Sequence, residues 1–176
     1  MMNKPNLLFP TPVWTIQLEN FRMINEEMYN FIKESQNKDQ KGIKKSNNKG
    51  WHSKDFNMKE IETQNFIKNI SPFIEKVITD MNWEKDKQSV KISNMWAIIN
   101  TGGSTNSRHQ HGNSTISGAY YVRAPENCGD IVFYDPRPAP VFYYPTAVSS
   151  NFLNAQVNSI TPKEGALILF PSYVDH

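Results

Sequence analysis

The stretch from Arg108 to Val122, RHQHGNSTISGAYYV, joins two signals that decide the interpretation of the whole chain. Its second part is rich in aromatic and β-branched residues and is typical of a β-strand. Its first part places His109 and His111 one residue apart, in a chain with four histidines. Residues i and i+2 of a strand point to the same face. Two imidazoles on one face can reach one divalent ion, so the pair predicts two ligands of a metal site.

A third ligand is expected at the last residue. The segment LILFPSYVDH contains an apolar strand, a Pro–Ser turn and then His176. A polar loop that holds two histidines by chance is the alternative for the pair, and the strand pattern together with His176 favours the metal. The fourth histidine, His52 in GWHSKDF, is interpreted as a surface or hydrogen-bonded residue rather than a ligand, beside Trp51 as an anchor into the core.

Length and composition set limits on the class of protein. With 176 residues, the chain is expected to form a single domain, residues 1–176. Hydrophobic residues make up 38% and charged residues 20%, which is typical of a globular protein, and the formal net charge of +2 gives no reason to expect nucleic acid as a partner. Cys128 is the only cysteine, so no intrachain disulfide can form. The N-terminal apolar patch is too short for a signal peptide or a membrane span, and a cytoplasmic protein is expected.

Residues 1–88 are expected to hold an N-terminal strand and helices. LLFPTPVWTIQL, Leu7 to Leu18, predicts an edge strand, because proline is tolerated at sheet edges. A helix with one apolar face follows, carried by Ile24, Met28, Phe31 and Ile32. The lysine-rich segment 37–50 lacks apolar periodicity and predicts a solvated, mobile loop, with a lid over the site as the alternative.

A further helical stretch is expected to begin near Lys59. Pro72 suits the first turn of another helix, with Ser71 as its N-cap. The buried stripe of that helix is expected to be Phe73, Ile74, Val77, Ile78 and Met81.

Residues 89–176 predict short antiparallel strands, since no long helical pattern separates them. They are punctuated by glycine, proline and asparagine. Such strands at regular spacing indicate a sandwich or jelly roll. The expected strands lie in SVKISNMWAIIN, TISGAYYVRA, GDIVFYDP, PVFYYP, NAQVNSITP and GALILFP.

Several motifs together resemble the iron(II)/2-oxoglutarate-dependent oxygenases of the double-stranded β-helix superfamily, especially a small group seen in bacteria and phages. The motifs are LLFPTPVW, MWAIINTGGSTNSRHQH, NSTISGAYYV, FYDPR and GALILFPSYVDH, from Leu7 to His176. The resemblance implies a mainly β, cupin-like jelly-roll core with the N-terminal helices packed outside it. It also implies Fe(II) as the metal and 2-oxoglutarate as the co-substrate.

The superfamily holds its metal with a His-x-Asp/Glu pair and a distal histidine. The resemblance places His109 at the first histidine, His111 at the carboxylate and His176 at the distal histidine. Replacement of the carboxylate leaves three neutral imidazoles, which also suit zinc, copper and nickel. A pair of His111 with Asn113 is the weaker alternative.

Co-substrate contacts are expected from Asn100, Tyr120 and Arg137. The family grips the far carboxylate of 2-oxoglutarate with a basic residue on the strand after the distal histidine, and that strand would lie beyond His176. The chain is therefore expected to be truncated and weakly active. Among Arg108, Arg123 and Arg137, the last is favoured because the resemblance includes DPR, with an ordering pair to Asp135 as the equal alternative.

Asn100, with Trp96, precedes the histidine pair on a strand that leads into it, although a turn residue and a core aromatic are the alternatives. For Tyr120, core packing is the stronger alternative to co-substrate binding.

The sequence predicts an Fe(II)/2-oxoglutarate-dependent dioxygenase that hydroxylates a small molecule or a protein side chain. One alternative is a catalytically inactive jelly-roll binding or structural module. Another is a three-histidine, cupin-like metalloenzyme that does not use 2-oxoglutarate. A homodimer is compatible with the sequence, and no membrane partner is expected.

Overall fold

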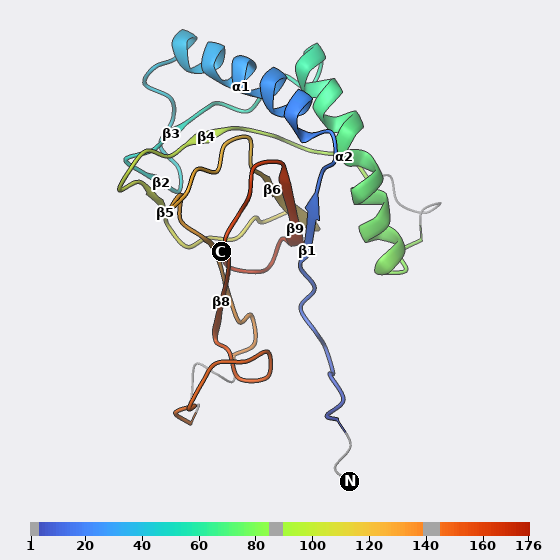
Figure 1. Ribbon diagram of the computed structural model, residues 1–176. Coiled ribbons are helices and arrows are strands. Elements are labelled where there is room, and N and C mark those ends of the chain that lie inside the picture. The colour runs from blue at the N-terminus through green and yellow to red at the C-terminus, as the bar shows by residue number, and fades with distance from the viewer. Residues whose placement is uncertain (1–3, 85–89, 139–144) are drawn as a thin grey trace.

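The computed structural model describes residues 4–84, 90–138 and 145–176. Among these residues strands are the more numerous elements, and two helices accompany them: α1 (Phe21–Lys38) and α2 (Ile61–Asp80). The strands are β1 (Trp14–Gln17), β2 (Asn47–Asn48), β3 (Trp51–His52), β4 (Ile98–Ile99), β5 (Thr105–Asn106), β6 (Ile116–Tyr120), β7 (Ile131–Tyr134), β8 (Val157–Ile160) and β9 (Ala166–Pro171). The helices lie in the first half of the chain and most of the strands, including the longest, in the second, as the sequence predicts (Figure 1).

The main sheet has the order β1-β9-β6, and both of its pairings are antiparallel. All six residues of the central strand β9 are buried, because its apolar sequence ALILFP can pack on both faces of the sheet. Alternation along β9 sends Leu167 and Leu169 to one hydrophobic cluster and Ile168 and Phe170 to another. Strand β1 lies at the edge of the sheet, which confirms the edge-strand prediction for Trp14–Gln17. Residues 7–13, which include both prolines, precede the strand and are not part of it.

Both helices cover the face of the sheet that carries Leu167 and Leu169 (Figure 1). Helix α1 buries Ile24 and Met28 there, and Phe31 and Ile32 pack against the same cluster, so the predicted apolar face of this helix is confirmed.

Helix α2 corrects the prediction of a helix start at Pro72. The helix runs without interruption from Ile61 to Asp80, with Pro72 in its interior. Ser71 does not cap an N-terminus, since its hydroxyl donates to the carbonyl of Ile67 within the same helix. Phe66, before the proline, and Val77, after it, are buried in one hydrophobic cluster. This burial stabilises a single continuous helix and offsets the backbone hydrogen bond that proline cannot make.

The opposite face of the main sheet packs against the antiparallel pair β7–β8. Phe133 of β7, Ile168 and Phe170 of β9, and Val174 form the buried cluster between the two sheets. Strand β8 extends away from the helices, on the same side as the N-terminal segment (Figure 1). The molecule thus has helices, the main sheet and the smaller sheet as successive layers.

The lysine-rich segment 37–50 is more ordered than the prediction of a mobile loop. Strand β2 within it pairs with β5, in the register Asn47↔Asn106 and Asn48↔Thr105. The backbone N–H of Ser107 donates to the carbonyl of Ser46 at 2.8 Å. The segment therefore lies beside the chain that leads into His109.

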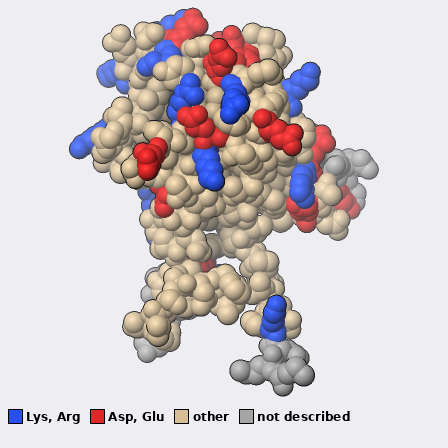
Figure 2. Space-filling view, in the orientation of Figure 1, with Lys and Arg blue, Asp and Glu red and all other residues tan. Residues whose placement is uncertain are grey.

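Charge is distributed unevenly over the molecule. Positively charged lysines and arginines and negatively charged carboxylates cover the part formed by the helices (Figure 2). The two parts of the molecule that project downward in this view are almost free of charged side chains. The sequence accounts for this, because residues 5–18 and 138–162 contain no charged residue. Large exposed apolar side chains lie in these two stretches: Leu7, Leu8, Phe9, Val148, Phe152, Leu153 and Val157.

Two further expectations can be placed against the structure. The predicted strand PVFYYP falls mostly on residues 139–144, which lie outside the described residues. No helix in the described part of the chain has the length and apolar character needed to cross a membrane.

Candidate metal centre

The backbone brings His109, His111 and His176 together at one end of the two sheets. The first two lie between β5 and β6, and the third follows β9. His109 and His176 exchange both backbone hydrogen bonds, each at 3.0 Å, and the N–H of His111 donates to the carbonyl of Ser172 at 3.1 Å. The histidine pair is not part of an assigned strand, contrary to the expectation, but it lies along an extended connection held by the C-terminal segment.

The three imidazoles face one another. One nitrogen atom of each ring lies within 4.8 Å of the corresponding atoms of the other two. Ring centroids are 5.1 Å apart for His109 and His111, 4.4 Å for His109 and His176, and 5.0 Å for His111 and His176. The Nε2 atoms of His109 and His111 are 3.2 Å apart. The convergence predicted from the sequence is therefore present, in a group that contains no carboxylate among the described residues.

Each imidazole is held from behind through its Nδ1 atom. Nδ1 of His109 donates to the carbonyl of Ser107 at 2.8 Å, and Nδ1 of His176 donates to the carbonyl of Val174 at 3.1 Å. Nδ1 of His111 lies 2.7 Å from the hydroxyl of Ser117. Outer hydrogen bonds of this kind fix ring orientation in metal sites and leave Nε2 to face the ion.

Burial favours the neutral form of two of the three imidazoles, those of His111 and His176. Desolvation, helped by the nearby His176 and His109, lowers the pKa of His111 from 6.5 to about 4. Desolvation also lowers the pKa of His176, against the opposing effects of the Val174 carbonyl and Asp175. Neutral imidazoles are the form that binds a metal, so at neutral pH His111 and His176 need not lose a proton first.

Aromatic rings surround the cluster. The ring of Phe170 lies edge-on to His176 at 4.6 Å, and Phe133 lies 6.5 Å from the same imidazole. Trp96 lies edge-on to His111 at 5.6 Å and stacks on His52 at 5.8 Å. These apolar walls explain the desolvation of His111 and His176.

His52 belongs to this aromatic wall and not to the group of three. It is 2% exposed, and its Nδ1 donates to the carbonyl of Ser53 at 2.6 Å. The interpretation of His52 as a hydrogen-bonded residue agrees with this contact. Trp51 donates from its indole nitrogen to the carbonyl of Asp39, which ties β3 to the end of α1.

An ion pair joins the residues that precede His109 and His176. Nε and Nη2 of Arg108 both donate to one carboxylate oxygen of Asp175, at 2.8 and 2.5 Å. The guanidinium carbon lies 4.1 Å from the ring centroid of Tyr134, and the N–H of Tyr134 donates to the carbonyl of Asp175. The pair therefore links the two histidine-bearing segments and the end of β7.

The structure does not bring Asn100 or Tyr120 to the histidines by any contact among the described residues. Tyr120 lies on the helix-facing side of β6, donates to the side-chain oxygen of Asn25 at 2.6 Å and packs edge-on against Phe66. Core packing is thus its observed role. Asn100 is exposed beyond β4, and its side-chain oxygen lies 2.1 Å from where a Cβ on Gly50 would stand.

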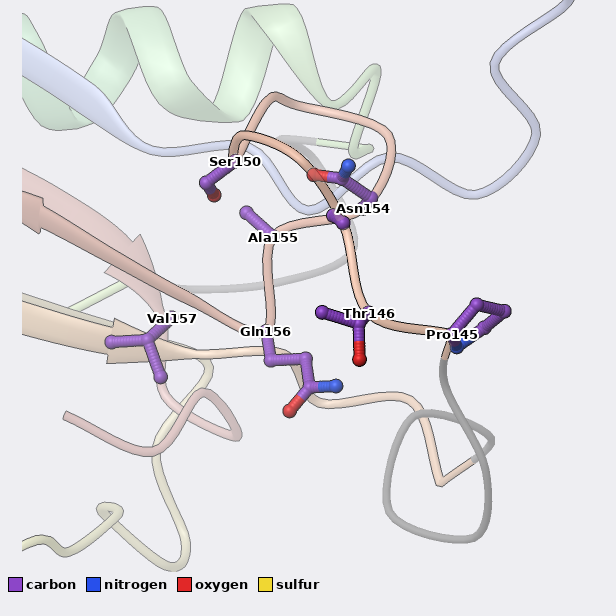
Figure 3. A pocket seen from close by; sticks show the side chains of 8 residues that line it. Pro145, Thr146, Ser150, Asn154, Ala155, Gln156 and Val157 are labelled. Carbon is purple, nitrogen blue, oxygen red and sulfur yellow. The ribbon is translucent and has the colours of Figure 1, made fainter.

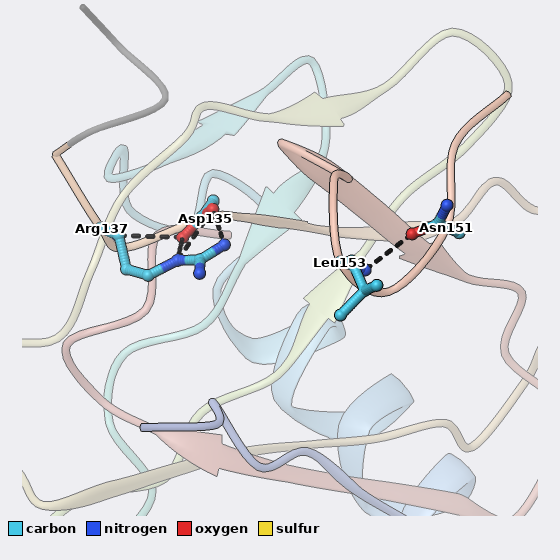
Figure 4. Close-up of polar contacts among 4 residues, drawn as sticks. All are labelled: Asp135, Arg137, Asn151 and Leu153. Atoms are coloured by element: carbon cyan, nitrogen blue, oxygen red, sulfur yellow. Dashed lines mark hydrogen bonds and ion pairs between the residues drawn. The ribbon is translucent and has the colours of Figure 1, made fainter. Parts of the chain in front are cut away.

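Arg137 forms the pair with Asp135 that the sequence offered as the alternative to co-substrate binding. Its Nε and Nη2 donate to the Asp135 carboxylate, and its backbone N–H donates to the same group at 3.0 Å (Figure 4). The guanidinium lowers the pKa of Asp135. Arg123 lies against Tyr29 and Glu164, and Asn113 occupies an exposed left-handed turn with φ of 64°.

A pocket of about 420 Å³ lies beside β8, separate from the histidines. Its lining includes Pro145, Thr146, Asn154, Gln156 and Val157, and Figure 3 shows these short and amide side chains around a loop rather than a charged cleft. None of the three histidines lines it, so it is distinct from the candidate metal centre.

Sequence reasoning missed two serines as site residues. The hydroxyl of Ser117 lies 2.7 Å from that of Ser172, which is 1% exposed. Each serine lies in a segment that the sequence analysis quoted, SGAYYV and FPSYVDH, but neither position relative to His111 could be read without the register of β6 on β9.

A comparison with protein families supports the chemistry of this group. The family model described as "Putative 2OG-Fe(II) oxygenase" matches residues 94–176, whereas the N-terminal motif LLFPTPVW lies outside the match. No curated protein matches the chain. The match supports the family that the sequence motifs resemble, that of the 2OG-Fe(II) oxygenases, over the residues that carry all three histidines.

Proposed function

We propose that the chain is an Fe(II)- and 2-oxoglutarate-dependent oxygenase whose metal is held by His109, His111 and His176. The observation that carries this proposal is the convergence of three imidazole nitrogens within 4.8 Å, in the part of the chain that matches the family. Imidazole is a common ligand of iron, and each ring is already oriented from behind. When bound, Fe(II) would supply oxygen activation coupled to the decarboxylation of 2-oxoglutarate.

The charge of the ligand set favours an anionic co-substrate. Three neutral imidazoles would leave the +2 charge of a ferrous ion uncompensated, and the carboxylate of Asp175, which precedes His176, is bonded to Arg108. A keto acid that contributes a carboxylate and a carbonyl oxygen would restore the missing anionic ligand. The loss of the usual aspartate would then be balanced by the co-substrate.

The layered arrangement supports a double-stranded β-helix as the finer description of the fold. Two antiparallel sheets enclose the cluster of Phe133, Ile168, Phe170 and Val174, and the histidines lie at one end of this core. In such barrels and sandwiches the mouth between the sheets is a common ligand site. Phe133, Phe170 and Trp96 would keep water from the reacting groups.

Arg137 is the candidate we retain for the far carboxylate of 2-oxoglutarate. Its fork of donors suits a carboxylate, as its hydrogen bonds to the Asp135 carboxylate illustrate (Figure 4). Substitution Arg137→Gln is expected to raise the concentration of 2-oxoglutarate needed for half-saturation, with metal affinity unchanged.

Anaerobic titration with Fe(II) and then 2-oxoglutarate tests the proposed function. The oxygenase predicts a visible metal-to-ligand charge-transfer band that needs both components. His176→Ala is expected to abolish the band, and His52→Gln, which changes the remaining histidine outside the cluster, is expected to retain it.

Other outcomes would replace the proposal. Metal binding without the band would favour the three-histidine, cupin-like metalloenzyme, which the absence of a carboxylate from the described cluster also supports. No metal binding at all would favour an inactive binding module.

A further inference from the structure

Two buried hydroxyls stand behind the one histidine that replaces the family's carboxylate. Ser117 is 7% exposed and Ser172 is 1% exposed, and their oxygens are 2.7 Å apart. The Ser117 oxygen is also 2.7 Å from Nδ1 of His111. The three groups form a short chain that ends at the metal centre.

The partners of His109 and His176 fix the hydrogen on Nδ1. Both Nδ1 atoms bond to backbone carbonyls, of Ser107 and Val174, and a carbonyl can only accept. In the neutral ring, Nε2 is then an unprotonated acceptor. The backbone thus holds these two imidazoles in the tautomer that can bind a metal.

His111 is different, because a hydroxyl can donate or accept. In one arrangement His111 donates from Nδ1 to Ser117, and Ser117 donates to Ser172. All three Nε2 atoms then carry lone pairs. In the other arrangement Ser172 donates to Ser117, Ser117 donates to Nδ1 of His111, and Nε2–H of His111 donates to Nε2 of His109 across 3.2 Å. The same heavy-atom positions satisfy both.

We infer that the Ser117–Ser172 hydroxyl pair is a positioning element that lets His111 change tautomer when a divalent metal binds. The inference rests on the proposed metal centre. One hydrogen leaves Nε2 and one is gained at Nδ1, while the hydroxyls of Ser117 and Ser172 rotate and keep their own hydrogens. The net proton count is zero and nothing is oxidised or reduced.

The hydroxyl pair is needed because the ligand at position 111 is a histidine and not a carboxylate. A carboxylate presents oxygen lone pairs without any choice of tautomer, whereas a histidine at the same position must expose an unprotonated nitrogen. A fixed carbonyl behind His111 would prevent the hydrogen bond between His111 and His109. A hydroxyl pair accommodates both that contact and metal binding.

Nitrogen-15 NMR of the imidazoles tests the inference directly in the full chain. Spectra of metal-free protein and of protein with one equivalent of Zn(II) are compared at a pH where the rings are neutral. His111 is expected to carry its hydrogen on Nε2 without Zn(II) and on Nδ1 with it. His109 and His176 are expected to carry theirs on Nδ1 in both samples.

Substitutions give a second, independent measurement. Ser117→Ala is expected to reduce Zn(II) affinity by about tenfold, the lower end of effects at such outer partners, because Nδ1–H of His111 loses its acceptor. Ser172→Ala is expected to have a smaller effect, since Ser117 remains. Ser114→Ala changes an exposed serine of the same segment and is expected to leave affinity unchanged.

The failures of the two proposals are distinguishable. If the unaltered protein does not bind Zn(II), the metal centre itself is wrong. If Zn(II) binds but His111 carries its hydrogen on Nδ1 in both samples, the tautomer inference is overturned even when the variants do not fold. Unchanged Zn(II) affinity in a folded Ser117→Ala variant would overturn it as well.

Discussion

At the scale of single residues, the imidazole of His111 is both partly buried and close to two other histidines. Its pKa is lowered to about 4, first by desolvation and then by His176 and His109. The unfolded chain, with an ordinary pKa near 6.5, binds more protons than the folded protein between these two values. The free energy of unfolding therefore rises with pH across that interval and is lost as the pH falls through it.

Substitution His111→Asn is expected to reduce this pH dependence, because the amide does not titrate. Urea unfolding of metal-free protein, measured across the interval from pH 4 to 6.5, checks the slope. His176, whose pKa is also lowered, will leave a residual slope in the variant. Equal slopes for the two proteins would contradict the assignment of the shift to His111.

The sequence predicted the convergence of the histidines but not what holds them. The i, i+2 spacing of His109 and His111 and the apolar strand before His176 were visible in the residues alone. The outer contacts were not, because Ser117 reaches His111 only through the register of β6 on β9 and its contact with Ser172. For the same reason Tyr120, an attractive candidate from its place in the motif, proved to lie on the helix-facing side of the strand.

At the scale of elements, the pair Arg108–Asp175 joins two segments that are far apart in sequence. It is partly exposed, and such pairs contribute about 1 kcal/mol or less. The pair is expected to stabilise the relative positions of His109 and His176 rather than the hydrophobic core. Arg108→Gln is therefore expected to weaken Zn(II) binding by about two- to fivefold, with the loss shrinking at high salt.

Arg123→Gln is the matched control, because Arg123 also combines an acidic partner, Glu164, with an aromatic ring, that of Tyr29. Isothermal titration with Zn(II) compares the variants. Equal losses for both arginines, or no loss for Arg108, would show that the pair does not position the ligands.

Helix α2 contains Pro72 in its interior, where the sequence pattern predicted the start of a helix. Pro72→Ala restores a backbone donor in the helix interior, but alanine also gives the unfolded chain more freedom. The net expectation is a gain of about 1–2 kcal/mol in the free energy of unfolding, measured with urea. A loss of stability would mean that the proline ring itself packs in a way alanine cannot replace.

The wrong helix start at Pro72 and the wrong loop prediction for residues 37–50 have the same physical cause. Proline favours a helix start by local geometry, but burial of Phe66 and Val77 in one cluster decided for a continuous helix. In the same way local composition predicted a loop at 37–50, whereas pairing of β2 with β5 is a contact between segments far apart in sequence. The order of the helices and antiparallel strands could be predicted from local sequence patterns. The continuous helix α2 and the β2–β5 pairing could not, because they depend on contacts between distant segments.

At the scale of the whole molecule, the proposed metal centre would join the segment after β9 to the connection before β6. A ligand that binds only the folded protein raises its stability, by about 2.7 kcal/mol at a hundred times the dissociation constant. For a chain of this size we expect Zn(II) to raise the melting temperature by roughly 5–10 °C under those conditions. Differential scanning calorimetry checks the shift, and EDTA should reverse it.

His109→Ala is the control for this shift, since it removes one of the three donors. An equal rise in melting temperature for the variant would mean that Zn(II) binds elsewhere on the molecule.

The reciprocal backbone hydrogen bonds between His109 and His176 have a practical consequence for preparing the protein. Peptide geometry sets how far apart the chelating rings stand, so a slip of one residue in the C-terminal segment would turn His176 outward. A misaligned chain would then offer fewer than three converging imidazoles to a column of immobilised nickel. Retention on such a column, without any added tag, would sort native from misaligned chains in a single elution.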